Sequence, residues 1–229
     1  MPTRAEVSII VPVYNEAATI EPLLRRILEH SGQAEILVVD DGSSDGTGAV
    51  LDRWAAAGTI RLLRHAVNQG KGVALREGIA AAYGQILLIQ DADLEYDPED
   101  YPAMLKPLLT GRATIVYGSR FLGAHRASYV WHRLGNWLLT QCVNVLFNAS
   151  LTDMETGYKA FHRRVLEGVR LRARRFEIEP ELTCQLLKRH HQIFEVPIAY
   201  YGRTYAEGKK ITWRDGVYAF WTILRVRCS

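Results

Sequence analysis

Cysteine is scarce in this sequence and is not arranged for a structural role. The 229 residues include three cysteines, Cys142, Cys184 and Cys228, which are far apart and odd in number. This spacing excludes a disulfide framework and a zinc knuckle, and it is typical of a reducing compartment. With 48% hydrophobic residues, a chain of this length buries roughly 70% of its unfolded surface. It can therefore fold on its hydrophobic core alone.

The sequence also lacks a strong excess of charge of either sign. It has 28 Lys and Arg residues against 25 Asp and Glu residues, which gives a net charge of +3. This balance is too even to indicate a nucleic-acid partner, because nucleic-acid-binding domains carry a marked basic excess. We therefore expect no nucleic acid among the partners.

No apolar run is suited to crossing a membrane. The uncharged stretch 134–152 contains four amide side chains, and amides are costly to bury in lipid. The apolar stretch 216–224 is only about half as long as a membrane-spanning helix. Residues 1–7 include Arg4 and Glu6 and have no apolar core of a signal peptide. We expect no membrane-spanning helix and a cytoplasmic protein.

Glycine-rich phosphate loops are missing as well. Neither the GxGxxG pattern of dinucleotide-binding folds nor the GxxxxGK[ST] pattern of P-loop enzymes occurs. This excludes a typical dinucleotide-dependent oxidoreductase and a P-loop nucleotide triphosphatase. A diphosphate bound by this protein would have to be neutralised by a metal ion and basic side chains.

Short apolar runs alternate with helical patterns through the first 118 residues. The runs predict strands, and the 3- and 4-residue spacing of apolar side chains between them predicts helices. Such alternation is typical of an α/β fold, in which a mostly parallel sheet is flanked by helices on both faces. We expect strands at 7–11, 36–39, 60–63, 86–89 and 113–117, and helices at 20–28, 47–57, 72–83 and 98–109.

The regular alternation ends after Gly118. The remaining sequence predicts long amphipathic helices, an edge strand and a charged loop, and no linker separates it from the first part. We therefore expect one domain over residues 1–229, with a first part at 1–118 and a second at 119–229. The expected elements are helices at 129–147, 178–190 and 213–225, a strand at 192–200 and a loop at 202–211.

Carboxylates follow three of the predicted strands. Glu16 follows the first strand, Asp40 and Asp41 the second, and Asp91 and Asp93 the fourth. The carboxyl ends of parallel strands form one edge of the sheet, where ligands bind. Two like charges as close in sequence as Asp91 and Asp93 need a cation or hydrogen bonds nearby. Their hard oxygen ligands suit Mg²⁺ or Mn²⁺ shared with a substrate diphosphate.

Asp45 is a carboxylate of a different kind. It directly precedes Gly46 and Thr47, where the second helix is expected to begin. Aspartate is a favoured residue before the first turn of a helix, and we expect Asp45 to cap this helix.

Eight motifs in one order extend this interpretation to a family. The sequence resembles family 2 glycosyltransferases, which have the Rossmann-like GT-A fold, and among them the polyprenyl-phosphate (dolichyl-phosphate) mannose and glucose synthases. The resemblance covers essentially the whole chain. The motifs are VPVYNE (11–16), VVDDGSSDGT (38–47), NQGKG (68–72), DAD (91–93), GSR (118–120), ETGYK (155–159), FEIEPE (176–181) and YYGRTYAEGKK (200–210).

The resemblance implies a donor site for a nucleotide-diphosphate sugar, formed mainly by residues 1–118. Tyr14 is expected to stack on the base and Glu16 to bind the ribose, and the metal is expected on Asp91, Asp93 and Glu95. Glu95 has the alternative of a solvated acid that leads into a helix. The donor-binding residues implied are Pro12, Tyr14, Glu16, Asp40, Asp41, Lys71, Asp91, Ala92, Asp93, Arg203 and Lys209.

The resemblance further implies a lipid phosphate as acceptor, bound by Ser119, Arg120, Arg133 and Asn136. Arg133 could equally lie at a membrane interface. A phosphate monoester has a second pKa of about 6 and is already an anion at neutral pH, so it needs cations more than a general base. We name Asp93, Arg120 and Asp153 as catalytic, and expect Asp153 to orient a cation rather than to accept a proton.

The 202–211 loop and the membrane-facing part have open interpretations. Arg203, Lys209 and Lys210 belong either to a loop that closes over the diphosphate, with Gly202 and Gly208 as its hinges, or to a solvated loop. Six arginines within 163–175 suit anionic lipid headgroups or a solvated face. The aromatic side chains and arginines of 213–227 suit an interfacial helix or core packing.

The predicted function is transfer of a hexose, with inversion, from GDP-mannose or UDP-glucose to a polyprenyl phosphate, with Mg²⁺ or Mn²⁺ as cofactor. The protein is expected on the cytoplasmic face of a membrane as a peripheral protein, with a membrane-anchor subunit as a further possible partner. One alternative is a family 2 enzyme that glycosylates a saccharide hydroxyl, for which Asp153 would be an essential base. Another is a non-catalytic nucleotide-sugar-binding protein.

Overall fold

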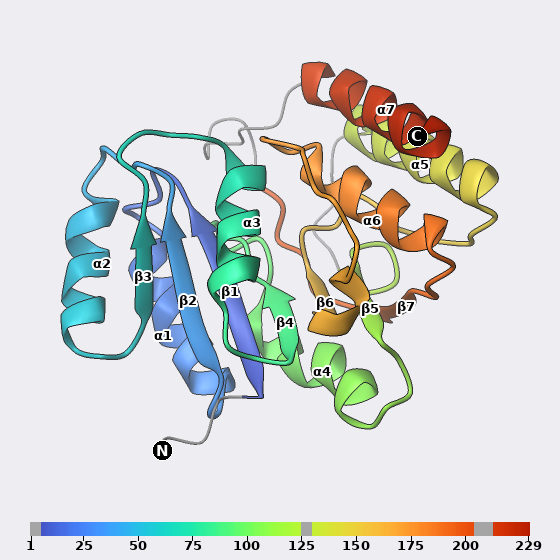
Figure 1. Ribbon diagram of the computed structural model, residues 1–229. Helices are drawn as coiled ribbons and strands as arrows, with labels where there is room; N and C mark the ends of the chain where they lie inside the picture. The colour runs from blue at the N-terminus through green and yellow to red at the C-terminus, as the bar shows by residue number, and fades with distance from the viewer. Residues whose placement is uncertain (1–5, 125–129, 204–212) are drawn as a thin grey trace.

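A seven-stranded mixed sheet organises the protein. The computed structural model describes residues 6–124, 130–203 and 213–229, without the side chain of Trp131 (Figure 1). The strand order across the sheet is β3-β2-β1-β4-β6-β5-β7. The strands are β1 (Val7–Val13), β2 (Glu35–Asp40), β3 (Arg61–Arg64), β4 (Ile86–Ile89), β5 (Ile115–Ser119), β6 (Lys159–His162) and β7 (Phe194–Pro197).

Seven α-helices lie in the described part of the chain, close to the predicted ranges. The fourth is preceded by a separate 3₁₀ turn, Pro98–Asp100, where the sequence predicted one continuous helix. A second 3₁₀ turn covers Arg163–Leu166. The helices are α1 (Ile20–His30), α2 (Thr47–Ala56), α3 (Lys71–Ala81), α4 (Tyr101–Leu109), α5 (Val130–Phe147), α6 (Ile178–Lys188) and α7 (Trp213–Cys228).

The sheet is mostly parallel, as predicted. Strand β1 runs parallel to β2 and β4, β2 parallel to β3, and β5 parallel to β7. The predicted edge strand is confirmed as β7. Strand β6 was not predicted, and it runs antiparallel between β4 and β5, where Phe161 pairs with Leu87 and with Ile115. Its four residues begin with Lys159, a residue depleted in strands, so pattern alone gives no signal for it.

Both faces of the sheet are buried, which explains the uninterrupted apolar runs of the strands. On β1, Ile9 and Val11 pack into one core with α1, α2 and α4. Ile10, between them, points to the opposite core, which includes α3 and α6. A third core joins α5, α6 and α7 away from the sheet, and Figure 1 shows α7 lying beside α5 and α6.

Helices α5 and α7 each have a buried and an exposed side. Val143 on α5 and Ile223 on α7 are fully buried in the third core, whereas Trp137 is 53% exposed and Trp221 is 64% exposed. Core packing, one of the two alternatives for the last helix, therefore applies to its inner side, and the interfacial position of its exposed side stays a prediction. Among the described residues, no helix is long and apolar enough to cross a membrane.

Asn144, one of the amide residues of the uncharged stretch, serves the fold. The side chain of Asn144 donates to the carbonyl oxygen of Leu151 at 2.9 Å and accepts from its amide at 2.8 Å. This pair of bonds fixes the chain where it leaves α5. One of the four amides that weakened the case for a membrane span therefore shapes a turn.

Arg163, the first arginine of the run 163–175, makes its hydrogen bonds within the fold. Its guanidinium donates to three main-chain carbonyl oxygens around the end of α3, those of Ile79 at 2.9 Å, Ala82 at 2.6 Å and Gly84 at 3.1 Å. Carbonyls at a helix C-terminus have no partner within the helix. Arg163 directly follows β6 in the sequence, so these hydrogen bonds connect the end of β6 to the end of α3.

Replacing Arg163 by alanine should lower the free energy of unfolding by about 2 kcal/mol, because three carbonyl oxygens lose their donor. Arg163→Lys should recover only part of the loss, since one ammonium cannot reproduce the planar guanidinium. Thermal unfolding monitored by circular dichroism measures the effect. The exposed neighbour provides the control, as Arg164→Ala should leave the melting temperature nearly unchanged. Equal stability of both alanine variants would contradict this role.

Candidate active site

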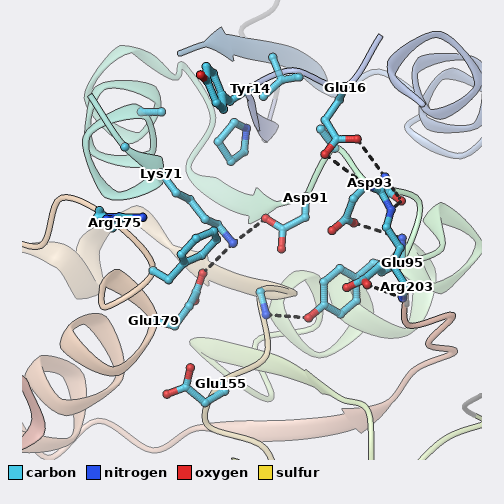
Figure 2. Close-up of a pocket in the computed structure, with 18 of the residues that line it drawn as sticks. Tyr14, Glu16, Lys71, Asp91, Asp93, Glu95, Glu155, Arg175, Glu179 and Arg203 are labelled. Carbon is cyan, nitrogen blue, oxygen red and sulfur yellow. Dashed lines mark hydrogen bonds and ion pairs between the residues drawn. The ribbon is translucent and has the colours of Figure 1, made fainter. Parts of the chain in front are cut away.

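A cavity of about 430 Å³ lies at the carboxyl ends of β1, β2 and β4, the edge at which the sequence predicted a ligand site. Side chains from distant parts of the chain face one another there (Figure 2). Of the predicted site residues, those that line the cavity are Pro12, Tyr14, Glu16, Asp41, Lys71, Asp91, Ala92, Asp93, Glu95, Arg120, Asn136 and Arg203.

Five predicted residues are not among the cavity lining. Lys209 lies outside the described residues, as does Lys210 of the same motif. The others, Asp40, Ser119, Arg133 and Asp153, are described, and each has a partner of its own. Ser119 shares a hydrogen bond of 2.7 Å with Thr152, and the guanidinium of Arg133 lies 5.5 Å from the ring centre of Phe121.

Asp40 and Asp45 organise the loop after β2. Asp40 is buried, with an ion pair of 2.9 Å to Arg64 and a hydrogen bond from the amide of Ser43. Asp45 accepts from the amide of Thr47 at 3.1 Å and from Ala17 at 3.0 Å. The residue at the N-cap position itself is Gly46, so the cap prediction for Asp45 is off by one residue. Asp45 ties the loop after β1 to the start of α2.

Asp41 is held rigidly at one end of the cavity. Its carboxylate accepts from the amides of Gln69 at 2.8 Å and Gly70 at 2.7 Å. The ring of His65 lies 2.6 Å from Asp41 on one side and 2.8 Å from Glu77 on the other. Burial alone would lower the pKa of His65, but its hydrogen bonds to the two carboxylates raise it above the usual value. The contact with His65 and the two main-chain amides fix the direction of the Asp41 carboxylate.

A row of four side chains with alternating charges begins at the cavity and continues into the protein. Lys71, at the start of α3, lies 2.6 Å from Asp91 and 3.1 Å from Glu179 of α6. Glu179 in turn lies 2.7 Å from Lys159 of β6, whose side chain is fully buried. Burial disfavours the charge on Lys71, but Asp91 and Glu179 raise its pKa above the usual value. We call these four residues the buried charge chain.

A second group of charges surrounds Arg203. Its guanidinium lies 2.9 Å from Glu16 and donates to the carbonyl oxygen of Asp93. The carboxylate of Glu95 accepts from the amide of Arg203 at 2.6 Å and from the hydroxyl of Tyr200 at 2.8 Å. Glu95 thus fixes the chain at 200–203, which the sequence did not predict.

The predicted metal ligands do not form a ready-made site. In the part of the chain that the structure describes, no three acidic, histidine or cysteine side chains converge on one point. Asp91 and Asp93 both line the cavity. Burial, followed by the charges of Glu95 and Asp91, raises the pKa of Asp93 to about 7. The mutual repulsion of these carboxylates fits a divalent cation whose remaining ligands come from a substrate and water.

Arg120 lies in the cavity wall close to Tyr200. Its guanidinium binds Asp153 through two contacts of 2.7 Å, and its amide donates to the same carboxylate at 3.0 Å. Asp153 is fully buried and has no face on the cavity. In the structure it orients Arg120.

Sequence reasoning missed several residues of the cavity. Glu155 and Glu179 lie in motifs that were recognised without a role being given to these positions. The hydroxyl of Tyr96 accepts a hydrogen bond of 2.9 Å from the amide of Gly157, an arrangement that no local pattern encodes. The missed lining residues with polar or aromatic side chains are Asn68, Tyr96, His132, Glu155, Arg175, Phe176, Glu179 and Tyr200.

The His65 bridge predicts a pH dependence. Because the pKa of His65 is raised in the folded protein, its stabilising contribution is complete below the unfolded value of about 6.5 and is lost as pH rises through the folded value. The melting temperature of the wild type should therefore fall more steeply above neutral pH than that of His65→Gln. Thermal melts at a series of pH values measure this, with the exposed His190→Asn as control. Parallel curves for wild type and His65→Gln would contradict it.

A family model and two similar proteins of known name agree on the kind of protein that this chain resembles. Residues 8–170 match the model of glycosyl transferase family 2. The chain is 31% identical to polyprenol monophosphomannose synthase of Mycolicibacterium smegmatis, over 84% of this chain and 76% of the relative. It is 30% identical to undecaprenyl-phosphate mannosyltransferase of Micrococcus luteus, over 87% of this chain and 85% of the relative.

Solved structures show the same architecture. Glucosyl-3-phosphoglycerate synthase from Mycobacterium tuberculosis, in complex with Mn²⁺, uridine diphosphate and glucosyl-3-phosphoglycerate, superposes with a TM-score of 0.72 at 25% identity. The match covers 98% of this chain and 80% of that one. The predicted α/β fold of the GT-A type is confirmed. By the family match over most of its length and by these relatives, the chain belongs to glycosyl transferase family 2.

Proposed function

We propose that this protein transfers a hexose, with inversion, from a nucleotide-diphosphate sugar to a polyprenyl phosphate. The observation that carries the proposal is that a single cavity is lined by the acidic pair Asp91 and Asp93 and by the guanidinium of Arg120. The first suits a metal-bound diphosphate, and the second suits an anionic acceptor. The names of the two mannosyl-transferring relatives support a lipid phosphate as the acceptor.

The nucleotide occupies the end of the cavity with Pro12, Tyr14 and Asp41. Tyr14 offers a ring to stack on the base, and Asp41 offers a carboxylate that the main chain holds in place. The uridine diphosphate in the complex of glucosyl-3-phosphoglycerate synthase supports a nucleotide at this site. GDP-mannose and UDP-glucose remain the proposed donors.

The diphosphate lies next to Asp91 and Asp93. These two carboxylates would hold Mg²⁺ or Mn²⁺, which stabilises the negative charge that develops on the departing diphosphate. Lys71 keeps Asp91 in place from behind, at 2.6 Å. Arg203 provides a cation on the opposite side of this pair, bound to Glu16. Glu95, with both oxygens engaged by Tyr200 and Arg203, contributes by fixing that cation.

The acceptor phosphate binds Arg120, with Asn136 nearby in the cavity wall. One of its oxygens attacks the anomeric carbon while the bond from that carbon to the diphosphate oxygen breaks, so a single in-line displacement inverts the configuration. The attacking oxygen is already ionised near neutral pH, and no proton has to be removed. Asp153, buried behind Arg120, serves to orient the guanidinium.

A peripheral position on the cytoplasmic face of a membrane brings the lipid to this site. Exposed aromatic side chains on α7, Trp213, Tyr218 and Trp221, lie among the arginines at 214, 225 and 227. Aromatic side chains with a cationic rim are typical of helices that lie in the membrane interface. A membrane-anchor subunit is a further partner that this surface suits.

Asp93→Asn should abolish the stabilisation of the protein by Mn²⁺ together with UDP or GDP, because the substitution removes a charged ligand. Differential scanning fluorimetry with and without Mn²⁺ measures this without any turnover. The exposed Glu29→Gln provides the control and should respond like the wild type. A full response to Mn²⁺ in Asp93→Asn would remove the metal assignment.

The same variant should respond differently to pH when no metal is added. A carboxyl whose pKa is raised to about 7 keeps its proton in the folded state while the unfolded chain loses it near pH 4, so the wild type loses stability as pH rises over that range. The neutral amide of the variant carries no such penalty. Asp93→Asn should therefore gain stability relative to the wild type toward pH 8, as thermal melts across pH would measure, and a pH-independent difference would contradict this.

Asp153→Asn tests the acceptor. With a phosphate acceptor it should reduce kcat by about tenfold or less, through looser positioning of Arg120, whereas loss of a general base costs about 10²- to 10⁴-fold. The measurement is nucleotide diphosphate released from UDP-glucose or GDP-mannose, with and without a short-chain polyprenyl phosphate. Lipid-independent activity toward a saccharide that collapses in Asp153→Asn would instead support a hydroxyl acceptor.

A further inference from the structure

Glu155 is a buried acidic residue of the cavity that the scheme above leaves unused. It lies in the segment between α5 and β6 and lines the cavity wall. In Figure 2, Tyr14 is at the top of the view and Glu155 at the bottom, with Asp91 between them. The Oε1 atom of Glu155 is buried and has no hydrogen-bond partner among the described residues. An unpaired buried carboxyl oxygen is costly, so a ligand group would stabilise it.

The cations near Glu155 are already bound by other groups. Lys159 lies 2.7 Å from Glu179 and also donates to the carbonyl oxygens of Met154 and Thr156. Arg120 makes its two contacts with Asp153. Glu155 is therefore not a member of either ion pair. Its role in the fold does not explain why its side chain is acidic.

The surroundings of Glu155 select the kind of group that it can bind. Burial raises its pKa to about 7 against the opposing effect of Lys159, and the charge of Glu179 adds to the rise. A phosphate oxygen would be repelled by these carboxylates. A hydroxyl carries no net charge and can both donate and accept, so it matches a carboxyl group in either protonation state. A sugar presents several such hydroxyls.

The position of Glu155 matches that of the transferred sugar. In the proposed reaction the hexose is attached to the diphosphate at Asp91 and Asp93 and must reach the acceptor at Arg120. Glu155 lines the cavity together with these three residues, and the charge of Arg120 acts on its carboxyl group. The phosphates occupy the cationic positions, and the hydroxyls of the sugar are left to face Glu155.

We propose that Glu155 binds a hydroxyl of the hexose in the donor and thereby contributes to the choice of sugar. This assignment rests on the proposed function for its donor class, a nucleotide-diphosphate sugar, but not on the identity of the acceptor. A buried polar group discriminates strongly against a ligand that lacks its partner, because the group is then left unpaired. Hexoses that differ in the hydroxyl facing Glu155 are thus distinguished here.

The test compares nucleotide-sugar binding with nucleotide diphosphate binding. Isothermal titration calorimetry with Mn²⁺ gives Kd for UDP, GDP, UDP-glucose, UDP-galactose and GDP-mannose. For the nucleotide sugar that the wild type binds most tightly, Glu155→Ala should raise Kd by about tenfold, because a hydrogen bond to the carboxyl group is lost. Its Kd for the matching nucleotide diphosphate should stay within about twofold of the wild type. For the same nucleotide sugar, the Kd of Glu155→Gln should lie between those of the wild type and Glu155→Ala.

Deoxy analogues of the same donor identify the hydroxyl. Removing the hydroxyl that contacts Glu155 should weaken binding to the wild type but have little further effect in Glu155→Ala, which is the coupling that a double-mutant cycle measures. A purely structural role would weaken all analogues alike. The exposed Glu167→Gln serves as a matched control, and thermal melts establish that each variant is folded.

The outcomes separate this proposal from that for the acceptor. Equal weakening of nucleotide and nucleotide-sugar binding, unchanged binding of both, or the absence of coupling to any hydroxyl would each overturn the role of Glu155. The titrations contain no lipid. A wild type that shows no lipid-dependent release of nucleotide diphosphate would therefore overturn the polyprenyl phosphate acceptor, while the assignment of Glu155 would still be decided by binding.

Discussion

The buried charge chain Asp91–Lys71–Glu179–Lys159 is the constraint on which the site depends. Its four members come from the end of β4, the start of α3, α6 and β6. Removing Glu179, which pairs with both lysines, would leave the fully buried Lys159 without its carboxylate, which is far more costly than losing a surface pair. These ion pairs therefore hold the end of β4 and the start of α3 in a fixed position relative to α6 and β6. Asp91, one member of the acidic pair, is held in place through Lys71 for the same reason.

The rest of the site is held in place by similar second contacts. Asp41 is fixed by two main-chain amides and His65, Arg120 by Asp153, and the 200–203 segment by Glu95. In each case a residue that would contact substrate is oriented by a buried partner. Such preorganisation means that little reorganisation is needed when the charges of the reaction develop. The cavity is thus largely formed without its ligands.

The parallel sheet and the carboxylates at its edge were predictable because both follow from local rules. Apolar runs of four to six residues give buried strands, and a parallel topology brings Asp41 and Asp91 to one edge. Strand β6 was not predictable, because Lys159 at its start is acceptable only beside Glu179, twenty residues away. Glu155 was overlooked for a related reason. Its significance lies in an Oε1 atom that has no hydrogen-bond partner among the described residues, and a sequence pattern does not encode an absent contact.

The third core has a consequence for how such proteins diversify. Helices α5, α6 and α7 pack on one another through Val143, Cys184 and Ile223, apart from the two cores that cover the sheet. Their outward faces can accumulate substitutions without disturbing the strands that carry Asp41, Asp91 and Asp93. The surface of this helical layer can therefore change while the geometry at the carboxyl ends of the strands stays the same.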